Sequence, residues 1–162
     1  MLGRSTVSYL LLKWLHVLSA TILFGTGIGS AYYLLCASLS REPRLIGRVA
    51  AWVVRADWMF TASTIVLQPL TGWLLMRATG FTLDAYWIRW SIGLYVLAFA
   101  CWVPVVWLQM RMRDLALEAA AKGEALPPAF RRCFLAWFVL GVPALFAFLA
   151  IFHLMVAKPA GG

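Results

Sequence analysis

Four long apolar segments constrain the fold more than any other feature of the sequence. They cover about residues 9–37, 58–76, 86–109 and 133–157. A helix needs about 20 apolar residues to cross the hydrocarbon core of a bilayer, and in lipid a helix satisfies its own backbone hydrogen bonds. We therefore predict an all-α fold, an integral membrane four-helix transmembrane bundle that forms a single domain over residues 1–162.

The composition excludes an ordinary soluble protein. Hydrophobic residues make up 64% of the chain and charged residues 12%, whereas about a quarter of the residues in a soluble domain are charged. The first apolar segment is too long for a signal-peptide core and is expected to be a retained helix. The three cysteines form no Cys-x-x-Cys pair, so neither a disulfide framework nor covalently attached haem is expected.

The basic residues predict how the bundle is oriented. Nine follow the first and third apolar segments: Arg41, Arg44, Arg48, Arg55, Arg111, Arg113, Lys122, Arg131 and Arg132. Five belong to the opposite side: Arg4, Lys13, Arg77, Arg89 and Lys158. The positive-inside rule then places both termini in the periplasm of a multi-pass protein of the bacterial inner membrane. The net charge of +8 is expected to meet anionic lipid headgroups and not nucleic acid.

Local patterns add detail to the helices. Pro43 is a favourable first helical residue, and the apolar periodicity after it predicts an amphipathic cytoplasmic extension of the second helix from residue 43. Residues 114–122 are expected to form a separate surface helix. Gly25 and Gly29 lie one turn apart and predict close contact with another helix.

Two polar positions stand near or within the second apolar segment. Pro69 should kink this helix, because it lacks a backbone N–H. Gln68 needs a partner in lipid, and an interhelical hydrogen bond is favoured over contact with a ligand. Asp57 precedes the segment and is expected to be a satisfied carboxylate at the interface, with a proton relay as the alternative.

The two histidines, His16 and His153, are the candidate metal ligands. Each lies a few residues inside an apolar segment, on the side of the membrane that holds both termini. Counted from Lys13 and Lys158, their depths differ by about 3 Å at a rise of 1.5 Å per residue. Two facing imidazoles in a bundle can hold a haem iron, and the small residues around Ser19 would leave room for the porphyrin.

Other interpretations of these residues remain open. A membrane histidine can simply form a hydrogen bond to a neighbouring helix. Arg89 lies on the histidine side and could pair with a haem propionate, or its side chain could extend to the interface. Zinc would require three or four ligands. A Ser/His/Asp hydrolase is not indicated, because Asp57 and Asp114 fall on the side opposite the histidines.

Several stretches resemble a family of predicted bacterial integral membrane proteins whose function is not known. The matching stretches are Lys13-Trp14-Leu15-His16-Val17-Leu18, Leu23-Phe24-Gly25-Thr26-Gly27, Leu67-Gln68-Pro69-Leu70-Thr71-Gly72, residues 101–109, Arg111-Met112-Arg113-Asp114-Leu115 and Met155-Val156-Ala157-Lys158-Pro159. The resemblance covers nearly the whole chain. It implies a four-helix membrane protein and brings no established activity.

The Lys13-x-x-His16 pattern is also distantly similar to the first helix of membrane protoporphyrinogen oxidase and of copper-resistance D proteins. In the oxidase the matching histidine is tied to haem binding, which this resemblance carries onto His16. The oxidase also relies on a lysine in a later helix, whereas this sequence has no lysine between Lys13 and Lys122. His153 would have to be the second ligand.

The sequence thus predicts a membrane protein that binds haem b through His16 and His153 and transfers electrons to a redox partner or a quinone. If it is an enzyme, a membrane oxidoreductase is the expected class. One alternative is a protoporphyrinogen-oxidase-like enzyme. Another is a cofactor-free membrane subunit that scaffolds a partner, which could be a second copy of the chain, or helps to move a small solute.

Overall fold

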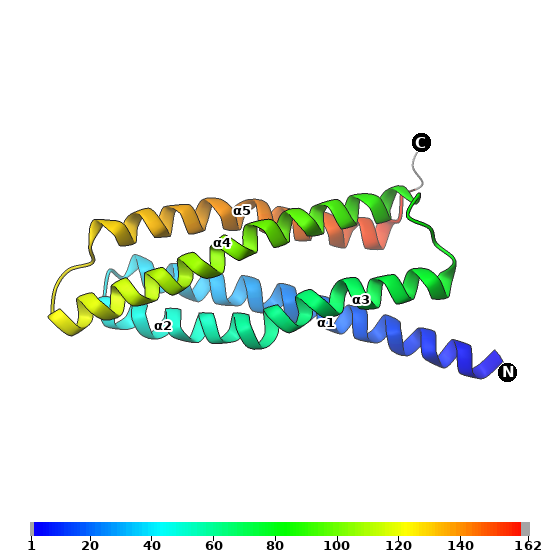
Figure 1. The fold of residues 1–162 in the computed structure, drawn as a ribbon, viewed down its shortest axis with the longest axis horizontal. Coiled ribbons are helices and arrows are strands. Elements are labelled where there is room, and N and C mark those ends of the chain that lie inside the picture. Colours follow the sequence, from blue (N-terminus) through cyan, green and yellow to red (C-terminus); the bar gives the residue numbers. More distant parts are fainter. Residues whose placement is uncertain (1, 160–162) are drawn as a thin grey trace.

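The computed structural model describes residues 2–159, with side chains from residue 7 onward. Its elements are α1 (Leu2–Leu39), α2 (Pro43–Ala56), the π-helix η1 (Asp57–Thr61), α3 (Ala62–Thr79), α4 (Tyr86–Lys122) and α5 (Pro128–Ala157) (Figure 1). Because α2, η1 and α3 follow one another without a break, the described residues form four long rods. All four are long and apolar enough to cross a membrane, which confirms the predicted all-α membrane bundle.

The four rods alternate in direction, so the bundle has two distinct ends. Both ends of the described chain and the connection from α3 to α4 lie at one end, here called the terminal end (Figure 1). The connections from α1 to α2 and from α4 to α5 lie at the other, here called the arginine-rich end. His16 and His153 therefore belong to the terminal half, as expected from an even number of crossings.

The helices are longer than the sequence pattern predicted. The prediction of a separate surface helix at 114–122 is wrong, because these residues are the last part of α4, which continues to Lys122. Good helix formers follow Gln109, and the helix ends only at Gly123, which adopts a left-handed conformation with φ 68°. α5 starts five residues before the predicted residue 133, at Pro128. Met1 and residues 160–162 of the predicted domain lie outside the described residues.

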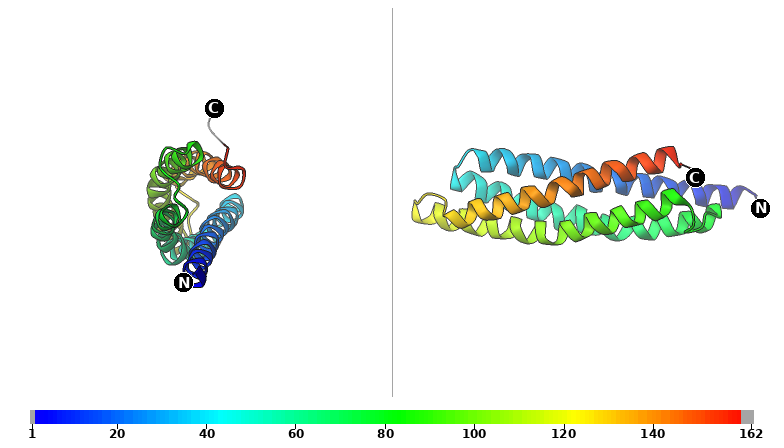
Figure 2. Two further views of the ribbon diagram at one scale, coloured as in Figure 1. Left: turned by 90° about the vertical axis from the view of Figure 1, so that its right-hand side faces the viewer. Right: turned by 90° about the horizontal axis from the view of Figure 1, so that it is seen from above.

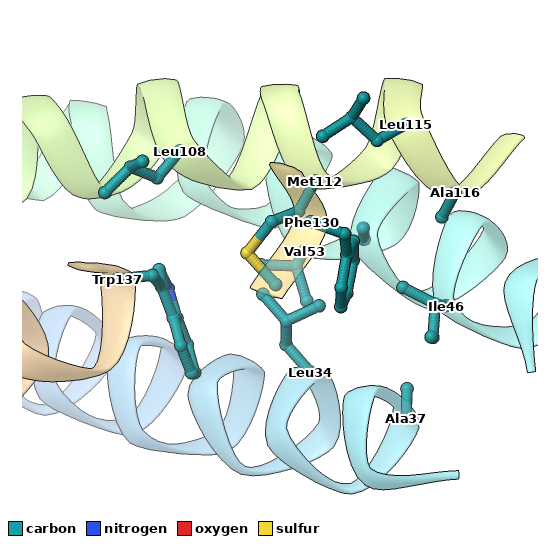
Figure 3. Packing of buried hydrophobic residues seen from close by; sticks show 11 residues of the cluster. Leu34, Ala37, Ile46, Val53, Leu108, Met112, Leu115, Ala116, Phe130 and Trp137 are labelled. Carbon is teal, nitrogen blue, oxygen red and sulfur yellow. The ribbon is translucent and has the colours of Figure 1, made fainter. Parts of the chain in front are cut away.

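The apolar core lies toward the arginine-rich end (Figure 3). Its most completely buried large side chains are Leu34, Ile46 and Met112. The cluster also includes Ala37, Ala50, Val53, Leu108, Leu115, Ala116, Phe130 and Trp137. The predicted amphipathic extension is present as α2, which buries Ile46 and Val53 and leaves Arg48 exposed. This part of the bundle is packed like a small soluble domain.

Close helix contact occurs at a glycine that the sequence pattern did not single out. A Cβ added to Gly47 in α2 would lie 2.6 Å from Leu117 Cδ2 and 2.9 Å from Leu117 Cγ in α4. By contrast, a Cβ added to Gly25 or Gly29 would meet nothing within 4 Å. The predicted helix contact at Gly25 and Gly29 is therefore wrong within this chain, since that face of α1 is open.

Pro69 lies inside α3, and the carbonyl that it leaves without a helical partner is bonded by another helix. A proline has no N–H to offer the carbonyl four residues earlier, which here belongs to Ile65. The Tyr95 hydroxyl of α4 donates to Ile65 O at 2.6 Å. This bond satisfies the freed carbonyl and ties α4 to the first turn of α3.

We expect Gly47→Leu to lower the free energy of unfolding by about 1–3 kcal/mol, because overpacking forces the α2 and α4 backbones apart. Gly25→Leu and Gly29→Leu serve as matched controls and should leave stability nearly unchanged. Thermal denaturation in detergent, followed by circular dichroism, measures the difference. Equal melting of Gly47→Leu and wild type would contradict the close packing of α2 on α4.

Candidate functional site

The His16 side chain is oriented by a threonine of the neighbouring helix. Its Nδ1 atom lies 2.8 Å from Thr71 Oγ1 in α3, and the Thr71 hydroxyl donates to Leu67 O at 2.6 Å. Because the Thr71 hydrogen is used in that bond, its oxygen accepts, and the His16 Nδ1–H donates. The hydrogen-bond pattern thus favours the tautomer with the proton on Nδ1, in which Nε2 keeps its lone pair.

Gln68 joins the same two helices one turn away from Thr71. Its Nε2 donates to His16 O at 2.9 Å and to Ser19 Oγ at 2.7 Å. The interhelical hydrogen bond predicted for Gln68 is confirmed. Ser19 is only 5% exposed and faces this amide. It also lines a pocket of about 170 Å³ together with Leu15 and Thr71, so the predicted room for a porphyrin stays a prediction. We call His16, Ser19, Gln68 and Thr71 the His16 network.

Gly72 lets α3 approach the imidazole ring. A Cβ added to Gly72 would lie 3.4 Å from His16 Cε1, which is at the tight limit of ordinary contact. The small residue at this position thus leaves just enough space for the ring. The His16 ring is consequently fixed by a hydrogen bond to Thr71 on one edge and by the Gly72 backbone beside it.

The structure does not bring His153 to His16. His153 is exposed on α5, and no interaction between the two histidines occurs in the part of the chain described. Phe24 of α1 contacts Phe152 of α5 with ring centroids 5.1 Å apart. His16 is eight residues before Phe24, so it lies on the order of 10 Å further toward the terminal end than His153. The predicted match in depth is therefore wrong.

The reason is the crossing of α1 and α5. The two helices cross near Phe24 and diverge toward the terminal end, where α1 runs beside α3 (Figure 2). The depths estimated from the sequence assume that the helices are parallel and end at the same level. In the structure α1 extends beyond the other helices at its N-terminus, which shifts the two helices in register (Figure 1).

The remaining candidate, Arg89, is exposed one turn into α4 at the terminal end. Lys158, just after α5, lies over the rings of Phe81 and Trp87 at 5.6 and 5.5 Å from their centroids. These cations line the terminal end of the bundle, where charged side chains reach water or lipid headgroups. Arg89 is thus free to pair with an anionic group.

The residue types present limit which metal centre could form. Among the residues that the structure describes, no group of three or more His, Cys, Asp or Glu side chains could hold a metal ion. A zinc site of the usual kind is therefore not available. A centre that brings its own equatorial ligands, as a porphyrin does, requires only one or two protein ligands, and His16 Nε2 is suited to that role.

The environment of Asp57 differs from the one predicted from the sequence. It begins the π-helix η1, is only 3% exposed and accepts a hydrogen bond from Thr61 at 3.0 Å through Oδ1. Its Oδ2 is buried and has no hydrogen-bond partner. The expected satisfied interfacial carboxylate is therefore wrong. The available signal was a single acid at the start of a long apolar segment, which marks functional sites in membrane proteins.

We expect Gln68→Leu to lower the free energy of unfolding by about 0.5–2 kcal/mol, because it removes the two hydrogen bonds that the Gln68 amide donates to α1. Ser63→Ala is the control, since the exposed Ser63 hydroxyl bonds only to carbonyls of its own helical rod. Denaturation in mixed detergent micelles measures both changes. A loss no larger for Gln68→Leu than for Ser63→Ala would show that the His16 network does not hold α1 on α3.

Comparisons with known proteins identify the family but not the activity. The model of one family, described as predicted integral membrane protein (DUF2269), matches residues 10–159. No curated protein and no solved structure matches the chain. The match extends over all four membrane-length rods, from α1 to the residues just after α5. The chain is therefore a member of the DUF2269 family of predicted integral membrane proteins.

Proposed function

We propose that this membrane protein binds haem b, with His16 as an axial ligand, and transfers electrons to a redox partner or a quinone. The observation that carries the proposal is the hydrogen bond from His16 Nδ1 to Thr71 Oγ1. Histidines that bind metals donate their other ring N–H to a neighbouring acceptor, which fixes the tautomer and the ring orientation. The contact of His16 Nδ1 with Thr71 Oγ1 has this arrangement.

His153 is the proposed second ligand. It is exposed near the end of α5 and is proposed to bind the iron from a second copy of the chain, because the two histidines of one chain differ in depth by about 10 Å. Arg89, also exposed at the terminal end, is proposed to pair with a propionate. When bound, the haem would supply the one-electron chemistry, while the chain supplies ligation, orientation and an apolar setting.

The first test is the visible spectrum of the protein purified from haem-replete cells. Ligation by both histidines predicts a six-coordinate low-spin haem with sharp bands after reduction. Acid-acetone should extract the haem, because no Cys-x-x-Cys-His sequence is present to hold it covalently. His16→Ala should empty the centre, and His153→Ala should convert it to high spin.

Two matched threonine variants test the orientation of His16. Thr71→Val removes the acceptor of the His16 N–H and should weaken haem binding by about 10–100-fold. Thr79→Val is the control, because the exposed Thr79 hydroxyl bonds only to carbonyls of its own helix. A colourless but fully helical wild-type protein would overturn the haem proposal and favour the cofactor-free membrane subunit. Turnover of protoporphyrinogen by a coloured protein would favour the oxidase-like alternative.

Arg89→Ala should leave the ligation intact and lower the midpoint potential of the haem. A nearby positive charge disfavours the oxidised iron, which is the more positive form, so its removal favours oxidation. Redox titration of the α-band measures the shift. An upward shift, or none, would remove Arg89 from the proposed haem site and leave the His16 assignment in place.

The proposal also includes an orientation in the bacterial inner membrane. Nine basic residues against five favour a cytoplasmic arginine-rich end and a periplasmic terminal end. At the arginine-rich end, Arg44, Arg48 and Arg111 are exposed, as expected for side chains at a membrane interface. A haem held near the terminal end would then lie close to the periplasmic surface.

A cysteine placed at Thr79 should react with a membrane-impermeant thiol reagent on intact cells, whereas one at Ala121 should react only after permeabilisation. Both positions are exposed near opposite ends of the bundle. Cys36, Cys101 and Cys133 would first be replaced by serine so that only the new thiol reacts. Labelling of Ala121→Cys alone on intact cells would reverse the proposed orientation.

A further inference from the structure

A cavity of about 350 Å³ lies in the middle of the bundle, between the His16 network and the apolar core. Its walls come from α1, α4 and α5, with Asp57 of η1 and Ile65 of α3 completing them. Neither histidine lines it. The volume falls within the usual range for small-molecule sites. Because neither histidine lines the cavity, it is separate from the proposed haem site.

Three polar atoms on the residues that line this cavity lack hydrogen-bond partners. They are Asp57 Oδ2, Gln109 Oε1 and Trp102 Nε1, all buried. Asp57 and Gln109 are each only 3% exposed. Leaving buried polar groups unpaired costs about 1–3 kcal/mol each. All three groups belong to residues that line one cavity, so a ligand in this cavity is a candidate partner for them.

The backbone at Asp57 provides a second, independent observation. Asp57–Thr61 form a π-helix between α2 and α3, and single π-turns inside helical rods are frequent at functional sites. The turn changes the register of the rod at the residue whose carboxylate is unpaired. Thr61, at the other end of the turn, occupies only Oδ1 of the carboxylate, which leaves Oδ2 for a ligand.

The remaining wall of the cavity combines aromatic rings with aliphatic and small residues. Apart from Trp102 and Tyr95, the rings are Phe24, Tyr32, Phe99, Trp137, Phe138 and Phe148. No Lys, Arg or His belongs to this wall among the described residues, so nothing there balances the Asp57 carboxylate. Aromatic faces attract organic cations, and the two unpaired acceptors, Asp57 Oδ2 and Gln109 Oε1, both require a donor.

We propose that this cavity binds a lipophilic organic cation of the protonated-amine class. Its ammonium N–H groups donate to Asp57 Oδ2 and Gln109 Oε1, and its apolar body packs against the aromatic rings. Trp102 Nε1–H is a donor for an acceptor atom on the same ligand. An ionisable group at such a depth in a membrane protein is expected to serve binding or transport, and this ligand class matches both the charge and the lining.

The test compares 1-naphthylmethylamine, which is protonated at neutral pH, with the neutral isostere 1-naphthylmethanol. Equilibrium dialysis uses the protein in lipid nanodiscs, with empty nanodiscs to subtract partition into lipid. We expect one saturable site that prefers the amine by about tenfold or more, which corresponds to about 1.4 kcal/mol. Asp57→Asn should reduce the preference to about twofold or less. Asp84→Asn, at an exposed acid in the connection from α3 to α4, should retain it.

Each other outcome decides against the proposal. Equal binding of the alcohol would indicate a neutral ligand, and the absence of saturable binding would indicate no site of this kind. Retention of the preference in Asp57→Asn would exclude the carboxylate. If Asp57→Asn does not fold, the wild-type comparison and Gln109→Leu, which should lose affinity about threefold or more, still decide. His16→Ala should bind the amine unchanged, because this site does not depend on haem.

Discussion

The hydrogen bonds between α1 and α3 are the interaction on which the terminal half of the bundle depends. Lipid tails are as apolar as leucine, so apolar contact alone drives helices together only weakly in a membrane. Gln68 compensates by donating to α1 at both His16 O and Ser19 Oγ. Thr71 accepts from the His16 ring one turn away. The same contacts that hold the two helices together also fix the His16 imidazole. Helix packing and the orientation of this side chain therefore depend on the same hydrogen bonds.

The bundle changes in character along its length, and the two proposed sites lie in different parts of it. At the arginine-rich end a dense apolar core holds all four rods together. In the middle a cavity is lined by aromatic rings and by the unpaired Asp57 carboxylate. At the terminal end the His16 network presents a free imidazole nitrogen. A rigid end, a hollow centre and an oriented histidine are compatible with one protein that binds a cofactor near one surface and an amine within the bundle.

The sequence alone predicts the fold well and the site only in part. Apolar segments of bilayer length required four helices, and Gln68 in lipid required an interhelical partner. The depth of His153 relative to His16 depends on how α1 crosses α5, which residue spacing does not contain. Gly25 and Gly29 form a small-residue face, but only the crossing geometry determines that Gly47 is the glycine in close contact. The burial of Asp57 depends on the π-turn, which has no simple sequence pattern.

The most direct measurement of the central claim is the tautomer of His16, observed by ¹⁵N NMR of the protein labelled at histidine in lipid. With only two histidines in the chain, a His153→Gln variant leaves the His16 signals alone. At a pH where the ring is neutral, the account predicts a proton on Nδ1, donated to Thr71, and an unprotonated Nε2. Thr71→Val should abolish this preference. A His16 ring protonated on Nε2 in the wild-type protein would contradict both the network and the ligand role proposed for it.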